Sequence, residues 1–226
     1  MSWPAEGSVI EAAALHAWQG RGTALLSDAA TDIGALLLEQ LSAERTLAKL
    51  PLFEAAAHAG RLAARLAIST EREFPSLRDL AAGLPAVFSE AQVRLGNPMP
   101  ARWVRRASEL AVQLGAHCGS RLIHGDLHYE NVLAATREPW LAIDPRPVLG
   151  EPEYSLPELM WRRIDEVDDD AAIRRLLRVL AEAGELNLDK ARGWVLVRCV
   201  EYGLWGLRHG LTADPQRCAR IINALV

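Results

Sequence analysis

The sequence contains almost no lysine, since only Lys49 and Lys190 are lysines among its 25 basic residues. Lys49 stands in an expected connecting segment just before Pro51, and Lys190 opens a late helix. Such a bias toward arginine suits a high-GC genome. The net charge is only −4 at pH 7, which argues against a nucleic-acid-binding stripe and agrees with a cationic small molecule as partner.

Cysteine is also scarce, and long apolar runs are absent. The three cysteines are far apart and form no C-x-x-C pair, which indicates reduced thiols in a cytosol. No apolar run reaches membrane-spanning length, and no early segment resembles a secretion signal. We therefore expect a cytoplasmic protein with no membrane partner. With 226 residues and 50% hydrophobic content, the chain can bury a sizeable core in one or two domains.

The most informative segment is His-Gly-Asp-Leu-His-Tyr-Glu-Asn at 124–131, followed by Asp144 after a short apolar run. Asp126 and Asn131 are five positions apart, as in the kinase catalytic loop H-R-D-x-x-x-x-N. The thirteen residues from Asn131 to Asp144 suffice for a β-hairpin that returns Asp144 beside the loop. The spacing therefore predicts that these three side chains meet.

Phosphoryl transfer needs these three groups. One carboxylate orients and deprotonates the attacking hydroxyl, while an amide oxygen and a second carboxylate hold Mg²⁺. Two simpler interpretations exist: a cap or turn role for each residue, and a zinc site built on His124, Asp126 and His128. Further zinc ligands do not cluster nearby at the expected spacing. We expect Asp126 to be the catalytic residue, with Asn131 and Asp144 as metal ligands.

Three runs, HGDLHYENVL, WLAIDP and GEPEY, resemble the aminoglycoside phosphotransferase superfamily, in the branch of streptomycin 6-phosphotransferases and hydroxyurea antibiotic-resistance kinases. The resemblance extends over nearly the whole chain, because other family features follow in the family's order: Ser2-Trp3-Pro4, Glu11, the W-x-G-R-G pattern at 18–22 and the L-L-L-E-x-L pattern at 36–41. It implies an α+β, protein-kinase-like fold with a small N-terminal lobe and a mostly helical C-terminal lobe.

The resemblance also implies roles and partners. Glu11 would pair with a nucleotide-binding lysine, the backbone of Glu39, Gln40 and Leu41 would bind the adenine edge, and Leu133 would pack under the adenine ring. ATP and Mg²⁺ would be the cofactors, and an aminoglycoside would be the acceptor. A remnant of the N-terminal lobe would occupy 1–41, and the helical lobe with the catalytic loop would occupy 42–226.

Two parts of a kinase nucleotide site are missing from the sequence. A glycine-rich loop and a lysine should precede Glu11, yet the ten residues before it contain one glycine and no lysine. We therefore expect an incomplete N-terminal lobe, from a misassigned start or a truncated gene, and homodimer formation through its exposed remnant. Three activities stay open: an antibiotic O-phosphotransferase, a non-catalytic remnant or pseudokinase, and a small-molecule metabolite kinase.

Periodicity and turn residues predict the secondary structure. Trp194 and Trp205 are expected in the core, and Ser155 should cap a helix with Glu158 completing a capping box. The stretches 41–51 and 145–152 are expected to be a connector and a loop. Strands are expected at 23–27, 35–39 and 121–123, and helices at 7–18, 53–68, 77–93, 101–117, 156–163, 171–183, 189–209 and 215–225.

Overall fold

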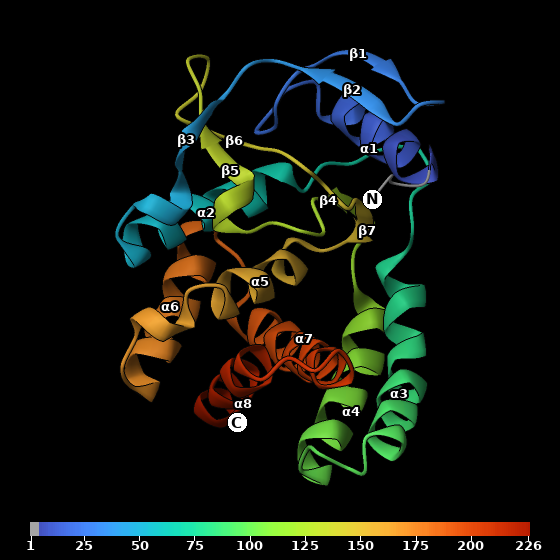
Figure 1. The fold of residues 1–226 in the computed structure, drawn as a ribbon, viewed down its shortest axis with the longest axis vertical. Coiled ribbons are helices and arrows are strands. Elements are labelled where there is room, and N and C mark those ends of the chain that lie inside the picture. The colour runs from blue at the N-terminus through green and yellow to red at the C-terminus, as the bar shows by residue number, and fades with distance from the viewer. Residues whose placement is uncertain (1–4) are drawn as a thin grey trace.

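The computed structural model describes residues 5–226, so the predicted match at Ser2-Trp3-Pro4 lies outside the described residues. An upper layer of one helix and two strands lies above small sheets, and helices fill the lower part of the molecule (Figure 1). This arrangement is the α+β, protein-kinase-like fold that the sequence predicts. None of the helices in the described residues is both long and apolar enough to cross a bilayer.

The upper layer consists of α1 (Ala5–Trp18), β1 (Leu26–Ala30) and β2 (Ala35–Leu38). The two strands pair antiparallel, and Gly34, with a φ of +72°, helps to close their turn. The first strand begins three residues later than predicted. Large apolar side chains remain exposed here, including Ile33 at 75% and Leu37 at 61%.

A second sheet holds the predicted hairpin. Antiparallel strands β5 (Val132–Ala134) and β6 (Trp140–Ala142) confirm it, with Val132 opposite Ala142. The sheet also contains β3 (Ser42–Thr46), which pairs with β5 inside the stretch predicted as a connector. That prediction was wrong because Ser-Ala-Glu-Arg-Thr is a polar edge strand with an irregular register and therefore shows no apolar alternation.

The third sheet joins β4 (Arg121–Ile123) to β7 (Val148–Gly150), with Ile123 opposite Val148. The strand β4 confirms the sequence prediction, whereas β7 lies in the stretch predicted as a loop. Prolines on both sides of this three-residue strand concealed it. A β-carbon on Gly150 would lie 2.6 Å from Leu77 Cδ2, so this strand packs tightly against the helix that Leu77 begins.

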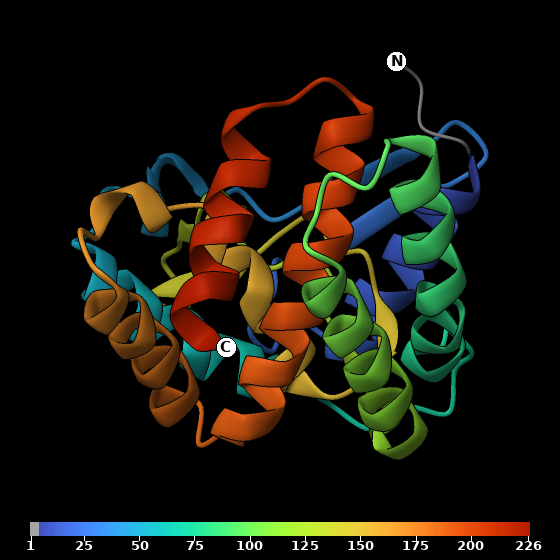
Figure 2. The same cartoon turned by 90° about the horizontal axis from the view of Figure 1, so that it is seen from below.

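Helices form most of the lower part and confirm the predicted ranges to within a few residues. The helices α7 and α8 lie between α6 on one side and the pair α3 and α4 on the other (Figure 2). Their bounds are α2 Leu52–Leu66, α3 Leu77–Arg94, α4 Ala101–His117, α5 Leu156–Trp161, α6 Asp170–Ala183, α7 Leu188–Arg208 and α8 Ala213–Leu225, and short 3-10 turns are η1 Leu47–Lys49, η2 Tyr129–Asn131, η3 Pro152–Ser155 and η4 Ile164–Glu166.

Side-chain expectations in this lower part had mixed outcomes. Trp194 is fully buried as predicted, and its Nε1 donates to Glu151 Oε1 at 2.6 Å. Trp205 is 48% exposed and stacks on Tyr202 near the end of α7, so its core assignment was wrong. Ser155 stands at the start of α5 but makes no capping bond, and its Oγ is buried without a partner among the described residues.

Candidate active site

The loop between β4 and η2 carries the predicted catalytic residue. Gly125 adopts a φ of +73°, and a β-carbon there would lie 1.9 Å from the backbone oxygen of Arg146. Only glycine fits such a contact. The close approach brings the loop of Asp126 against the segment that follows Asp144.

Asn131, one of the two predicted metal ligands, connects the catalytic loop to the segment that leads to Asp144, the other. Its Nδ2 donates to the backbone oxygen of Asp126 at 3.2 Å, and its own backbone oxygen accepts from the N–H of Ile143 at 2.9 Å. Because Nδ2 makes this hydrogen bond, Oδ1 is the atom of the Asn131 amide that could bind a metal. Asp144 follows immediately, at a φ of +55° that is rare for a residue with a side chain. The structure thus brings Asp126, Asn131 and Asp144 together.

The donor set fits Mg²⁺ and does not fit zinc. Amide and carboxylate oxygens are the ligands that Mg²⁺ takes in nucleotide sites, where phosphates and water complete its coordination. Within residues 5–226, no three His, Cys, Asp or Glu side chains converge to hold a metal on their own. His128 instead pairs with Glu130, at 2.9 Å between Nδ1 and Oε2. Asn131 and Asp144 are therefore the residues that could hold Mg²⁺ together with a nucleotide.

His124 joins the catalytic loop to the segment around Asp144 through two hydrogen bonds. Its Nε2 donates to the backbone oxygen of Ile143 at 3.0 Å, and its backbone oxygen accepts from the N–H of Arg146 at 2.9 Å. Complete burial lowers the pKa of His124 to about 4, so the ring is neutral near pH 7. The ring also stacks on Trp18 of α1, with 6.3 Å between centroids. His124 therefore links the upper layer to both sides of the candidate site.

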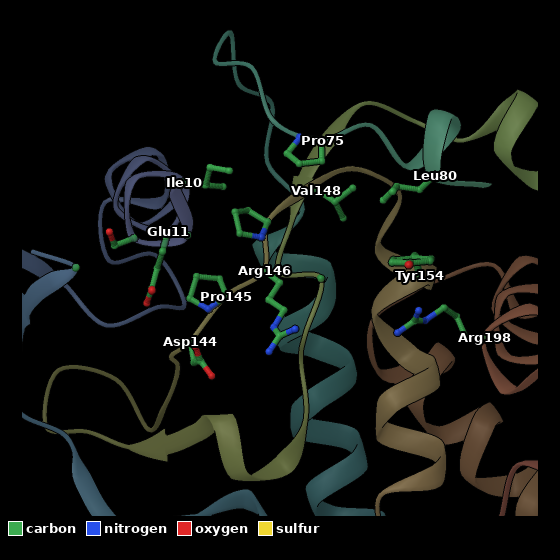
Figure 3. Close-up of a pocket in the computed structure, with 15 residues that line it drawn as sticks. Ile10, Glu11, Pro75, Leu80, Asp144, Pro145, Arg146, Val148, Tyr154 and Arg198 are labelled. Atoms are coloured by element: carbon green, nitrogen blue, oxygen red, sulfur yellow. The ribbon is translucent and has the colours of Figure 1, made fainter. Parts of the chain in front are cut away.

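A cavity of about 460 Å³ opens between α1, the segment after Asp144 and the walls formed by α3 and α7 (Figure 3). Glu11 lines it from α1, and Asp144 lines it from below. Burial, followed by repulsion from Asp144, raises the pKa of Glu11 to about 7. None of the described lining residues is a lysine. The predicted glutamate therefore faces the predicted metal ligand, with no lysine between them in the described structure.

Tyr154 and Arg198 form the opposite wall. The Arg198 guanidinium lies 5.4 Å from the ring centroid of Tyr154 and 5.9 Å from that of Trp161. It also pairs with two carboxylates, Glu201 at 2.6 Å and Glu158 at 3.4 Å. These contacts hold Arg198 in one place.

Glu158 connects this wall to the catalytic loop. Burial, and then the nearby charge of Asp126, raise the pKa of Glu158. Its side chain is 16% exposed, the same fraction as that of Asp126. Two largely covered carboxylates therefore repel one another beside the loop.

The predicted adenine-binding residues lie apart from this cavity. The backbone N–H of Glu39 donates to Leu25 at 2.9 Å, and its carboxylate binds Arg137 at 2.6 Å. Gln40 borders a separate cavity of about 110 Å³ beside β3 and β5. Leu133 is buried opposite Leu141 in the hairpin. The nucleotide roles of Glu39, Gln40, Leu41 and Leu133 stay predictions.

Sequence reasoning missed Arg146, although it stands two residues after Asp144. Its Nε lies 3.2 Å from Oδ2 of Asp126, and its side chain is 62% exposed. The signal available in the sequence was its position between Pro145 and Pro147, directly after a predicted metal ligand. The roles of Tyr154, Glu158 and Arg198 had no comparable signal, because only the fold brings α5 and α7 to the cavity.

Comparison with known proteins gives close relatives. The chain is 35% identical to a streptomycin 6-kinase of Streptomyces griseus, over 100% of this chain and 75% of the relative. It is 36% identical to a hydroxyurea phosphotransferase of Kitasatospora aureofaciens, over 99% of this chain and 66% of the relative.

Solved structures support the fold at low sequence identity. An apo thermostable mutant of the aminoglycoside phosphotransferase APH(4)-Ia superposes with a TM-score of 0.62 at 15% identity, over 98% of this chain and 83% of that one. A choline kinase of Streptococcus pneumoniae superposes with a TM-score of 0.60 at 13% identity, over 98% and 80%. The sequence pattern of one family matches residues 4–210. The chain belongs to the aminoglycoside/hydroxyurea antibiotic resistance kinases, a family of phosphotransferases.

Proposed function

We propose that the protein is an ATP- and Mg²⁺-dependent O-phosphotransferase that modifies a hydroxyl of a streptomycin-like aminoglycoside. The observation that carries the proposal is the single hydrogen-bonded frame around the site. Asn131 binds the backbone of Asp126 and receives Ile143, and His124 binds Ile143 from below. The frame supports the proposal, because phosphoryl transfer depends on positioning a base beside the residues that hold the metal.

Each residue has a defined role in this proposal. Asp126 orients the acceptor hydroxyl and takes its proton as the oxygen attacks the terminal phosphorus atom of ATP. Asn131 and Asp144 hold Mg²⁺, which supplies positive charge to the phosphates. A nucleotide is supported by a solved relative in fold, whose complex contains ADP and hygromycin B. Glu39, Gln40, Leu41 and Leu133 are the proposed adenine contacts.

The organisation and location of the protein belong to the same proposal. Residues 1–41 contribute to an N-terminal lobe, and residues 42–226 form the helical lobe. The cysteines Cys118, Cys199 and Cys218 are all buried and unpaired, which supports a reducing cytoplasm. A small-molecule acceptor is in keeping with the cavity of about 460 Å³.

Two alternatives rest on specific observations. A relative of similar identity is named a hydroxyurea phosphotransferase, so hydroxyurea is the second candidate acceptor. A non-catalytic role is favoured by the absence of lysine from the described lining of the cavity, because that charge normally helps to position the phosphates.

A labelled-phosphate assay separates these functions. The chain is incubated with Mg²⁺ and terminally labelled ATP, and streptomycin, hydroxyurea and choline are offered in parallel. Transfer to streptomycin, abolished in Asp126→Ala, supports the proposal. Transfer to hydroxyurea alone, or to choline alone, would identify that compound as the acceptor in place of streptomycin. Binding of Mg-ATP with no transfer to any acceptor identifies a non-catalytic protein and contradicts the proposal.

A further inference from the structure

Arg146 is held against the residue that the proposed function makes the base. We propose that Arg146 is the cation that grips the phosphoryl group during transfer, and that its ion pair with Asp126 is a resting position that it leaves when phosphate arrives. This inference rests on the proposed phosphotransferase function. The geometry that motivates it is the 3.2 Å contact between Nε of Arg146 and Oδ2 of Asp126.

The backbone of Arg146 is fixed relative to the catalytic loop. Its N–H donates to the backbone oxygen of His124, and its own backbone oxygen lies where a β-carbon of Gly125 would be. The prolines at 145 and 147 restrict the chain on both sides. Reorientation of this side chain therefore needs rotation about its own bonds and no movement of the loop.

The ion pair between Arg146 and Asp126 is a weak one. The side chain of Arg146 is 62% exposed, so solvent screens its attraction to Asp126. A phosphate offers more negative charge and two oxygens that match the guanidinium fork. Figure 3 shows Arg146 in the middle of the cavity, with Asp144 and Glu11 on one side and Tyr154 and Arg198 on the other. A phosphate beside the Asp144 metal site would thus lie on the side toward which Arg146 can turn.

Other cations of the described chain are poorly placed for this task. Arg198 is clamped between Glu201 and Glu158 and between two aromatic rings. Lys190 pairs with Glu151 behind the wall, and Lys49 belongs to η1. Among the described cavity-lining residues, Arg146 is therefore the cation best able to follow a phosphate.

The movement of Arg146 away from Asp126 also makes the proposed base accessible to the acceptor. In the transfer, the acceptor hydroxyl oxygen forms a bond to the terminal phosphorus atom while the bond from that phosphorus to the bridging oxygen breaks. The breaking electron pair leaves with ADP, and the hydroxyl proton passes to Asp126. Arg146 donates hydrogen bonds to a non-bridging oxygen throughout. When Arg146 leaves Oδ2, that oxygen of Asp126 is open to the acceptor hydroxyl.

Binding of inorganic tripolyphosphate tests the grip directly. Isothermal titration calorimetry at fixed ionic strength compares the intact chain with Arg146→Ala and Arg146→Lys. We expect Arg146→Ala to weaken binding roughly 10- to 100-fold, the effect of losing a charged hydrogen bond, and Arg146→Lys to weaken it less. The matched control is Arg65→Ala, because Arg65 is 52% exposed and pairs with Glu138 at 2.7 Å outside the cavity. The control should bind like the parent.

A double-mutant cycle tests the resting position. Asp126→Asn should tighten tripolyphosphate binding a few-fold, because Arg146 no longer has to leave a carboxylate. That gain should vanish in the Asp126→Asn, Arg146→Ala double variant. A gain that persists would reflect simple repulsion by Asp126 and would overturn the proposed exchange. If the parent and Arg146→Ala bound tripolyphosphate with equal affinity, or if the parent did not bind it, the proposed contact between Arg146 and phosphate would be overturned.

These measurements fail independently of the proposed function. Tripolyphosphate contains no acceptor, so a wrong acceptor leaves the titrations unchanged. Conversely, transfer to streptomycin with full affinity for tripolyphosphate in Arg146→Ala would support the enzyme and reject the role of Arg146. Circular dichroism of each variant establishes folding, and Arg146→Gln replaces Arg146→Ala if the alanine variant does not fold.

Discussion

The upper layer and the helical lower part contribute to the candidate site by different physical means. The lower part contains most of the large buried side chains, such as Trp194 and Leu180 at 0% exposure, whereas the strand layer leaves Ile33 and Leu37 mostly exposed. Asp126 and the proposed metal ligands Asn131 and Asp144 lie in segments next to strands that border the helical core. Glu11 belongs to α1, in the layer whose two strands leave large apolar side chains exposed. The proposed base and metal ligands thus border the buried core, whereas Glu11, a proposed nucleotide residue, belongs to the more exposed layer.

Direct hydrogen bonds connect the two regions near the hairpin and at Trp18. The N–H of Ala24 donates to Ala142, the N–H of Ala142 donates to Gly22, and Trp18 Nε1 donates to the backbone oxygen of Leu66 at 2.8 Å. Arg137 adds contacts to the backbone oxygens of Gly20 and Thr23. A two-stranded sheet is only marginally stable by itself, so these connections give the upper layer much of its support.

The largest expected effect is on the rate of phosphate transfer and comes from replacing Asp126. In a form of the chain that transfers phosphate, Asp126→Ala should lower the rate by roughly 10²–10⁴, because a positioned base is lost. Affinity for Mg-ATP should stay nearly unchanged, since Asp126 acts on the acceptor. Single-turnover transfer and calorimetry measure the two quantities. Near-normal turnover by the variant would remove Asp126 from its assigned role.

Stability should show the same contrast. Leu180→Ala in the core should lower the free energy of unfolding by about 2–5 kcal/mol, through lost burial and a cavity. Leu37→Ala, at a side chain that is 61% exposed, should change it by less than about 0.5 kcal/mol. Urea denaturation of both variants provides the comparison. A large loss from Leu37→Ala would show that the upper layer is packed better than its exposure indicates.

Metal-dependent binding should distinguish two carboxylates of the site. Asp144→Asn should weaken Mg-ATP binding more than Asp126→Ala, because a neutral amide cannot replace the charge of a metal-binding carboxylate. Titration of both variants with Mg-ATP and with metal-free ATP measures this. Equal affinities would indicate that Asp144 serves only the local backbone.

The pH dependence of stability should report on Glu11. Its pKa rises from the ordinary value of 4.5 to about 7 in the folded protein, so the folded state binds the proton more tightly than the unfolded state. This contribution to stability is fully present below pH 4.5 and is lost as pH rises through 7. Glu11→Gln should flatten the unfolding free energy between these limits by roughly 1 kcal/mol, a value reduced for solvent screening. An unchanged slope would place Glu11 in water.

Self-association of the chain should involve the smallest change in free energy, and it can be measured directly in solution. We expect the chain to associate through the exposed apolar side chains of its upper layer, Ile33 and Leu37. Ile33→Ser with Leu37→Ser should reduce association while leaving the fold intact. Static light scattering measures association, and circular dichroism measures the fold. A monodisperse monomer of the parent chain would contradict this expectation.

The sequence predicts the parts of the molecule that depend on local pattern. Amphipathic α4 and α6, the hairpin after Asn131, and the convergence of Asp126, Asn131 and Asp144 follow from periodicity and spacing. The sequence does not reveal β3 and β7, because a three- to five-residue edge strand has too few side chains to show alternation. It also does not reveal the exposure of Trp205 or the pairing of Arg146, which depend on contacts between distant segments.

The stacking of Trp18 on His124 has an optical consequence. This indole is completely buried, and its ring lies against the histidine beneath the catalytic loop. Indole emission responds to local polarity, so the junction between the two layers contains an intrinsic spectroscopic probe. Displacement of α1 from the loop would expose Trp18 to water and shift its emission toward longer wavelength. In a variant that keeps only this tryptophan, the colour of the emitted light would report whether the upper layer is seated on the lower part.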